Sequence, residues 1–237
     1  MRAAFARAVQ TTAHMRPNVR SAAHETKSIA QRINDARVTV VLGSGSPTRR
    51  AVLTSLGVAH VVEAPNIDEK SIRHDDPHAL VTALAQAKAT KVLEVLAARD
   101  NDSAEGERPR VLVITCDQVV VHRGEIREKP TSVDEAKSFI RGYGIEPPST
   151  VGSVMVTDVQ SGRSSLAVDV NTIVFDGPFP DDVVDGLVAD GTCMKCAGGL
   201  MVEHELLQPY LNRIDGRMDG VMGLSAVTVE RLLAEYI

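Results

Sequence analysis

A stretch of small and basic residues, GSGSPTRR, is the first part of this sequence whose residue types suggest chemistry. Four small residues, from Gly43 to Ser46, separate an apolar run from Pro47 and the pair Arg49-Arg50. Small residues let backbone N–H groups approach an anion, and a helix that begins here adds partial positive charge. Ser46 can cap that helix, and an arginine can bind an oxyanion. The stretch predicts a phosphate-binding loop, with a tight turn and two solvated arginines as the alternative.

The glycine spacing of this loop matches neither of the two best-known nucleotide-binding patterns. A Walker A loop needs a lysine that is absent here, and the dinucleotide-binding pattern needs a third glycine where Thr48 stands. The loop alone therefore does not identify its ligand.

Acidic and basic residues that could act on a bound phosphate occur in three other segments. Asp68 and Glu69 form an acidic pair in a predicted loop and could hold Mg²⁺ beside a phosphate. Asp117 is predicted to end a buried strand, where α/β proteins place ligand-binding groups. Lys88 and Lys129 could reach a phosphate. The alternatives are a turn cap for Asp117 and solvated side chains for the others.

The pair Cys193 and Cys196 invites a metal or redox interpretation. A zinc site needs four ligands, and only Cys116 and His204 are plausible additions. Two small buried residues in a strand are the favoured interpretation. The histidine spacing and the serine context support neither a metalloprotease nor a serine hydrolase.

Composition limits the class of protein. The 237 residues can form one large domain or two small ones, and 43% hydrophobic with 24% charged residues is typical of a globular chain. An aromatic content of 3% and a net charge of -5 argue against nucleic-acid binding. No apolar run approaches the roughly 20 residues of a membrane span. The odd number of cysteines, three, favours a reducing compartment such as the cytoplasm.

The elements that must position these residues follow from hydrophobic periodicity. Buried strands are expected at 38–42 and 111–116, a short strand at 60–65, a hairpin at 119–126 and a long two-stranded ribbon at 151–175. Helices are expected at 48–56, 77–98, 133–144, 181–191 and 224–236. This order predicts an α/β fold with a mixed twisted sheet and helices on both sides. The ribbon is expected to form a second lobe, with the active-site cleft between the lobes.

The N-terminal part, residues 1–36, is predicted to be a basic extension of a domain at 37–237. Four arginines and no acid precede Glu25, a composition found in organellar transit peptides. The alternative is an Ala-rich helix that caps the domain surface. Residues 100–110 are polar and charged, and predict an inserted surface loop between two elements.

Six segments, in this order, resemble the Maf family of nucleoside triphosphate pyrophosphatases, whose fold is like that of the inosine triphosphate pyrophosphatases. The resemblance covers about residues 38–237. It rests on LGSGSPTRRAVLTSLG, NIDE, LAQAKA, TCDQVVVHRGEIREKP, CAGGLMVE and RIDGRMDGVMGL. The resemblance implies that Ser44, Ser46 and Arg49, with Arg50 beside them, belong to the phosphate-binding loop.

The same resemblance assigns roles to the acids and lysines. It gives Glu69 and Asp117 to a divalent metal, Mg²⁺ or Mn²⁺, and to the attacking water. It gives Lys88 and Lys129 to the polyphosphate, with Lys129 counted among the catalytic residues. Glu203 falls where the family has Gln or Glu near the active site, and is taken as a third metal ligand and substrate contact.

The sequence departs from the family pattern in three places. Gly43 stands where Ala is usual, TCDQ replaces the more frequent GADT, and one extra residue lies between Glu203 and RIDG. Gln118 after the Asp, Glu203 in place of Gln, and the segment SPTRR resemble the subgroup that acts on 7-methyl-GTP more than the subgroup that acts on dTTP and UTP.

The resulting prediction is hydrolysis of a nucleoside triphosphate to the monophosphate and pyrophosphate, as house-cleaning of the nucleotide pool. The alternative from another class is a non-catalytic regulator of cell division that binds nucleotides or a protein partner. An inosine triphosphate pyrophosphatase is a closer alternative. The resemblance also allows a homodimer. No nucleic-acid or membrane partner is expected, and organellar targeting by the extension stays open.

Overall fold

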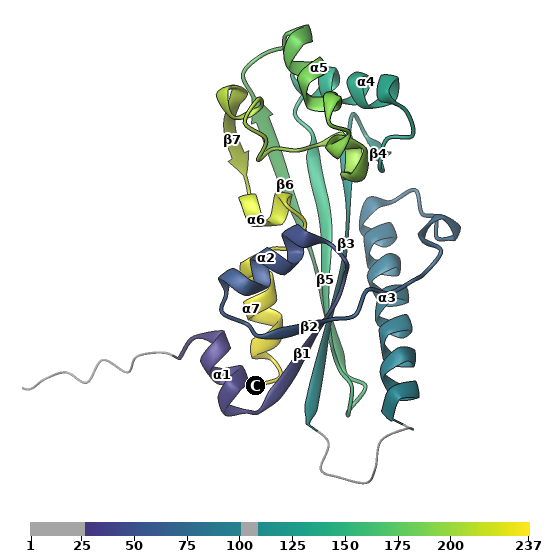
Figure 1. Ribbon diagram of the computed structural model, residues 1–237, viewed down its shortest axis with the longest axis vertical. Helices are drawn as coiled ribbons and strands as arrows, with labels where there is room; N and C mark the ends of the chain where they lie inside the picture. Colours follow the sequence, from purple (N-terminus) through teal and green to yellow (C-terminus); the bar gives the residue numbers. More distant parts are fainter. Residues whose placement is uncertain (1–26, 101–108) are drawn as a thin grey trace, which may run out of the picture.

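One seven-stranded sheet forms the centre of the molecule (Figure 1). The structure is a computed structural model that describes residues 27–100 and 109–237. The strands are β1 (Val38–Gly43), β2 (His60–Val62), β3 (Arg110–His122), β4 (Glu125–Arg127), β5 (Ser149–Asp158), β6 (Ser164–Phe175) and β7 (Leu211–Asp215). Their order is β2-β1-β3-β5-β6-β7, with β4 paired to β3. The first three strands of this order are parallel and the other pairs are antiparallel, so the predicted mixed sheet is confirmed.

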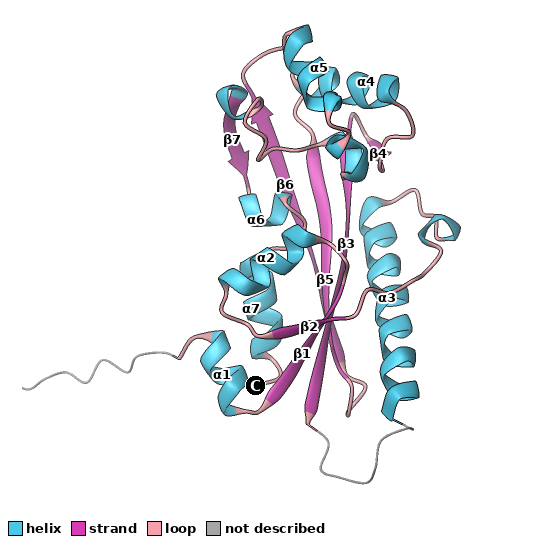
Figure 2. Cartoon of the chain, viewed as in Figure 1, coloured by secondary structure: helices cyan, strands magenta, loops and turns pink. Residues whose placement is uncertain are grey.

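Helices cover both faces of the sheet (Figure 2). They are α1 (Ile29–Asp35), α2 (Pro47–Ser55), α3 (Pro77–Asp100), α4 (Val133–Tyr143), α5 (Asp181–Ala189), α6 (Met218–Val221) and α7 (Ala226–Ala234). Among the described helices, only α3 lies along one face, where Val81 and Val92 are fully buried. On the opposite face Leu53 of α2 and Leu233 of α7 join one apolar cluster with strand residues. These layers place α3 against the middle of β3 and β5.

Strand β3 is longer than the sequence predicts. We expected it to stop at Asp117, but it continues to His122 and pairs Asp117 with Ser153 of β5. Three valines follow Gln118, two of them buried, and ten consecutive pairs with β5 continue the strand past Asp117. Asp117 therefore projects from the middle of a strand, and its neighbour Gln118 projects to the other face because side chains alternate.

The long ribbon also differs from its predicted place. Its two strands, β5 and β6, form the expected hairpin, with Gly162 at a φ of 70° in the turn. The hairpin is not a lobe of its own, because β5 also pairs with β3 and β6 also pairs with β7. The ribbon thus runs through the middle of the sheet and joins both ends of the molecule.

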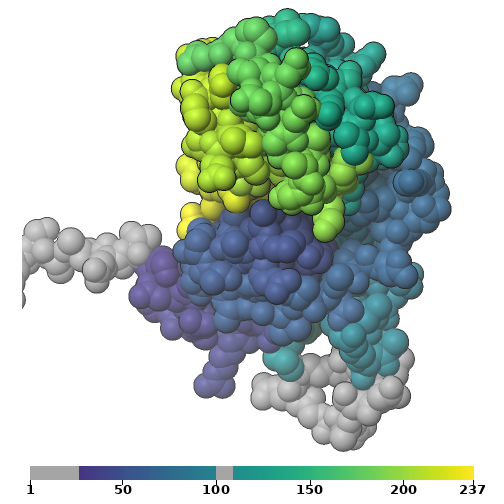
Figure 3. Space-filling view, turned by 45° about the horizontal axis from the view of Figure 1, so that its top comes forward, coloured from purple at the N-terminus to yellow at the C-terminus, as the bar shows by residue number. Residues whose placement is uncertain are grey.

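The upper end in Figure 1 is built by α4, α5 and three short 3₁₀ turns around a second apolar cluster. These turns are Thr192–Lys195, Ala197–Gly199 and Gln208–Tyr210. Cys193 is buried in the first of them and Cys196 follows it half-buried, so the expected strand at this pair is wrong. In the space-filling view this end lies directly against the blue surface of the segments that follow β1 (Figure 3).

Part of the predicted N-terminal extension belongs to the folded core. Ile29 and Ile33 of α1 are buried in the same cluster as Leu233 of α7. Residues 1–26, to which the transit-peptide prediction applies, and residues 101–108 of the predicted surface loop lie outside the described residues. Within the described residues, no helix combines the length and apolarity that a membrane span requires.

Candidate active site

Two carboxylates meet at one lysine on the face of the sheet that α3 covers. Lys88 of α3 donates to Oδ1 of Asp117 in β3, and its Nζ lies 2.8 Å from Oε1 of Glu69. Glu69 begins a 3₁₀ turn, Glu69–Ser71, in the loop before α3. The Lys88 and Asp117 side chains are 7% and 11% exposed, whereas Glu69 is 49% exposed. Glu69 thus adds a half-exposed carboxylate to the buried ion pair of Lys88 and Asp117 and connects that pair with solvent.

The charges around Glu69 act on its acidity. Burial raises the pKa of Glu69, but the hydrogen bond from Lys88 and the positive charges of Lys88, Lys129 and Arg49 outweigh burial and leave the pKa below its ordinary value of 4.5. This arrangement keeps Glu69 ionised at neutral pH. Lys88, Lys129 and Arg49, all predicted site residues, thus lie close enough to Glu69 for their charges to act on it.

The predicted anion loop lies at the end of β1 and leads into α2. Ser46 is the N-cap of α2, and its Oγ accepts a hydrogen bond from the backbone N–H of Arg49, while Pro47 occupies the first turn. The Ser44 hydroxyl accepts from the backbone N–H of Ser46 and from Nη1 of Arg49, both at 3.3 Å. The predicted cap is confirmed, and the loop is held in shape by its own side chains.

Arg49 joins this loop to the C-terminal segment RMDGVMGL. Its Nε donates to the carbonyl of Gly223 at 3.0 Å, and its Nη1 donates to the carbonyl of Cys116 at 3.1 Å. Gln118 donates to the carbonyl of Gly220 in the same segment at 2.7 Å. Arg49 thus donates to carbonyls and makes no ion pair with an acid among the described residues.

Two departures from the family pattern prove to be direct neighbours. Gly43 and Thr115 are register partners in the parallel pair β1–β3. A Cβ on Gly43 would lie 2.6 Å from Cγ2 of Thr115 and 3.1 Å from Val92 of α3. The two departures therefore compensate each other. The methyl group of Thr115 fills the space that an alanine side chain at position 43 would need.

Three predicted site residues lie at the margin of this cluster. Lys129 follows β4, is exposed, and makes no ion pair or hydrogen bond with the described residues. Glu203 is exposed in a turn near Cys196, whose pKa is raised to about 11 by burial and then by the charge of Glu203. Arg50 is exposed on α2. The charge of Lys129 acts on Glu69, whereas among the described residues Glu203 and Arg50 make no hydrogen bond or ion pair with the carboxylate pair.

The sequence did not reveal several residues that build this site. Ser153 of β5 accepts a hydrogen bond from the backbone N–H of Asp117. Arg73 pairs with Glu128 at 3.0 Å and so connects the loop of Glu69 with the loop of Lys129. Only Gly220 and its neighbours had a visible signal, the repeated glycines of the last motif. The other contacts join residues far apart in the chain.

The carboxylate pair fits a divalent cation that is completed by its substrate. Mg²⁺ usually takes one or two protein carboxylates and fills its other positions with water and phosphate oxygens. Glu69 and Asp117 point at one common atom, Lys88 Nζ, so they can offer two such ligands. The described residues contain no group of three or more His, Cys, Asp or Glu placed to hold a metal. Within the described residues Glu203 is not grouped with Glu69 and Asp117, so its role as a third ligand stays a prediction.

Comparison with known proteins agrees with this architecture. The Maf-like protein family matches residues 39–236. The chain belongs to the Maf-like proteins. The resemblance to this family, first seen in six motifs, is thus confirmed over residues 39–236.

Relatives of this Maf-like chain carry enzymatic names. The 7-methyl-GTP pyrophosphatase of Dictyostelium discoideum is 31% identical over 196 residues, which are 83% of this chain and 96% of that protein. A nucleoside triphosphate pyrophosphatase of Streptomyces coelicolor is also 31% identical, over 83% of this chain and 89% of its own length. The dTTP/UTP pyrophosphatase of Salinibacter ruber is 29% identical, over 82% of this chain and 89% of its own length.

Proposed function

We propose that this chain hydrolyses a nucleoside triphosphate to the monophosphate and pyrophosphate with the help of Mg²⁺ or Mn²⁺. Nucleoside triphosphate pyrophosphatase activity follows from its place among the Maf-like proteins and from the names of its relatives. The observation that carries the site assignment is the meeting of Glu69 and Asp117 at Lys88, beside a loop that suits an anion.

The phosphates would bind between the loop at Ser44 and the exposed Lys129. Backbone N–H groups at the start of α2 and the guanidinium of Arg49 would bind phosphate oxygens. Arg49 is suited to this role because its bonds to two carbonyls fix its direction and leave it outside any ion pair with the described residues. Lys88 and Lys129 would neutralise the charge that develops on the departing pyrophosphate.

Asp117 is the proposed general base. Its carboxylate would orient a water molecule and take its proton as the water oxygen attacks the α-phosphorus. The bond between this phosphorus and the bridging oxygen then breaks, and pyrophosphate leaves. A divalent cation held by Glu69 and Asp117 would, when bound, supply charge for the phosphate oxygens and lower the pKa of the water. The Lys88 ammonium holds both carboxylates close together through its two ion pairs.

A 7-methyl-GTP-like substrate is the preferred candidate within this activity. Gln118 and Glu203 support it, because both match the subgroup of that name, and the Dictyostelium discoideum relative has the same designation. The carboxylate of Glu203, exposed on the Lys129 side of the site, could complement a cationic methylated guanine. The alternative specificity is for dTTP and UTP, the nucleotides in the name of the Salinibacter ruber relative.

A nucleotide panel tests the proposal. The purified chain is incubated with 7-methyl-GTP, dTTP, UTP, ITP and GTP, with Mg²⁺, Mn²⁺ or EDTA, and released pyrophosphate is measured. In ¹⁸O-labelled water we expect the label in the monophosphate, because attack occurs at the α-phosphorus. Fastest turnover of 7-methyl-GTP, abolished by EDTA, is the expected result.

Other outcomes of the panel would overturn particular parts. Fastest turnover of ITP would favour the inosine triphosphate specificity, and turnover in EDTA would remove the metal from the mechanism. No release from any nucleotide would contradict the enzyme and favour a non-catalytic regulator. The homodimer and the cytoplasmic location stay predictions, which sedimentation and localisation of the tagged full chain would test.

A further inference from the structure

Two buried hydroxyl groups attach α3 to the sheet at the level of the candidate site. Thr115 of β3 donates from Oγ1 to the carbonyl of Ala85 at 2.9 Å, and Ser153 of β5 donates from Oγ to the carbonyl of Val81 at 2.7 Å. Thr115 and Ser153 are 0% and 1% exposed. Water is therefore excluded from both bonds, and each donor has this one carbonyl to satisfy it.

The same hydroxyls flank the candidate general base. Thr115 lies two residues before Asp117 on the same face of β3, and Ser153 is the register partner of Asp117 in β5. The Ser153 Oγ also accepts a hydrogen bond from the backbone N–H of Asp117 at 3.2 Å. One oxygen atom is thus bonded to the strand that carries the base and to the helix that carries its partner.

The positions of these bonds along α3 determine where Lys88 lies. The bonded carbonyls belong to residues 81 and 85, and residue 88 is the next position of the same helical face. Apolar contacts hold the helix on the sheet, but they are non-directional and do not fix its axial position. Hydrogen bonds do fix it, because they weaken steeply with distance and angle. The Lys88 ammonium depends on that position, since it is buried between two carboxylates.

We propose that Thr115 and Ser153 are positioning residues that hold α3 so that the Lys88 ammonium lies between Glu69 and Asp117. The kinetic consequence rests on the proposed function, whereas the effect on Lys88 rests on the geometry alone. Gly43 contributes to the same arrangement, because the lack of a side chain there leaves room for the methyl group of Thr115. Neither hydroxyl touches substrate in this proposal; both act through the helix.

The test replaces each hydroxyl while keeping the packing. Thr115→Val retains the shape and removes the donor, Ser153→Ala removes the second donor, and Thr115→Ser restores the donor without the methyl group. Thr157→Val is the matched control, because Thr157 is a buried threonine of β5 whose hydroxyl is bonded to Ser164 and not to α3. For each variant the melting temperature, kcat and KM for pyrophosphate release, and the ¹H–¹⁵N signal of the Lys88 ammonium are measured.

We expect Thr115→Val and Ser153→Ala to lower kcat about tenfold each while KM stays within about twofold, because a tenfold change corresponds to one misplaced interaction in the transition state. The Lys88 signal should shift in both variants and return in Thr115→Ser. An unshifted Lys88 signal, or a kcat loss no larger than that of Thr157→Val at equal melting temperature, would overturn the proposal. If the unmodified chain releases no pyrophosphate, the proposed function fails, and the Lys88 signal alone decides the positioning role.

Discussion

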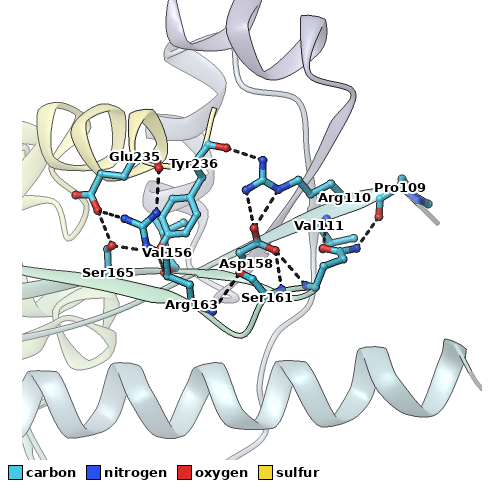
Figure 4. A network of polar contacts seen from close by, with 11 residues as sticks. Pro109, Arg110, Val111, Val156, Asp158, Ser161, Arg163, Ser165, Glu235 and Tyr236 are labelled. Atoms are coloured by element: carbon cyan, nitrogen blue, oxygen red, sulfur yellow. Dashed lines mark hydrogen bonds and ion pairs between the residues drawn. The ribbon is translucent and has the colours of Figure 1, made fainter. Parts of the chain in front are cut away.

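Strand β3 carries two clusters of paired charges, one at its first residue and one past its middle, and they are built differently. At the first residue, Arg110 donates from Nε and Nη2 to Asp158 at 3.0 and 2.6 Å, and from Nη1 to the carbonyl of Tyr236 at 2.6 Å (Figure 4). The other Asp158 oxygen accepts from the backbone N–H groups of Gln160 and Ser161. Both oxygens of this carboxylate are therefore used within the chain.

The cluster at Asp117 is incomplete by comparison. Within the described residues, Lys88 is the only donor to the Asp117 carboxylate, Arg49 is bonded to no acid, and Lys129 has no ion pair. Both signs of charge remain available there, next to a helix start. A closed set of charges stabilises a fold, whereas an open set of the same residue types can bind and act on a charged ligand.

The largest effect that separates the two clusters is expected from Asp117→Asn. An amide cannot take a proton from water, so kcat for pyrophosphate release should fall by about 10³-fold, the range of general-base catalysis. Circular dichroism should show an intact fold, because Lys88 keeps its contact with Glu69. Turnover within tenfold of the unmodified chain would exclude Asp117 as the base.

The reciprocal change, Asp158→Asn, is expected to affect stability and not catalysis. Burial raises the pKa of Asp158, but the bonds from Arg110 and from the backbone N–H of Ser161 outweigh it and lower the pKa. Loss of these charge-assisted bonds should cost about 2–3 kcal/mol of unfolding free energy, or roughly 5–10 °C in melting temperature. The kcat at 25 °C should not change.

The pH dependence of this stability difference follows from the sign of the shift. Because the pKa of Asp158 is lower in the folded chain, its contribution is complete above the ordinary value of 3.8 and is lost as the pH falls through the lowered value. Urea unfolding at pH 7 and below pH 3.8 measures it. An Asp158→Asn variant that keeps its stability but loses turnover would reverse the distinction between the clusters.

Periodicity and residue type predicted most of the fold. The strands, the long α3 and the turn at Arg123-Gly124 follow from local patterns, and both turn residues have the positive φ that a tight hairpin needs. The turn and cap that lead into α2 were also visible, since a capping serine, a first-turn proline and small residues act locally. Family membership then supports the identity of the acids.

The errors concern residues whose environment comes from distant parts of the chain. Asp117 was taken as a strand end because an isolated carboxylate does not belong in a buried strand, but Lys88, 29 residues earlier, compensates it. Ser153 gave no signal, because its role depends on pairing β5 with β3. Cys193 was assigned to a strand, although the glycines around it favour tight turns. Local sequence does not contain such tertiary partners.

Packing behind the open cluster can be tested with Gly43→Ala. The added methyl group would meet Thr115 at 2.6 Å, so we expect a loss of about 1–3 kcal/mol in unfolding free energy. The double variant with Thr115→Ala should recover part of this loss, with a coupling of about 1 kcal/mol. Gly45→Ala is the control, because its Cβ would lie 3.6 Å from Ala64 in ordinary contact. Additive losses in the double variant would show that the two strands do not share this space.

The smallest expected effect concerns the acidity of Glu69, the half-exposed member of the open cluster. Since its pKa is lowered, Glu69 should lose its charge only as the pH falls below 4.5, and the contact with Lys88 should persist down to that range. In Lys88→Met, burial is opposed only by Lys129 and Arg49, so the pKa should rise. Carboxylate ¹³C NMR titration measures both values, and Lys91→Met, which removes a half-exposed lysine paired with Glu94, should leave them unchanged. If the pKa of Glu69 in the unmodified chain is 4.5 or above, Lys88 does not stabilise the ionised carboxylate. The cluster at Asp117 would then lack one of its two proposed metal ligands at mildly acidic pH.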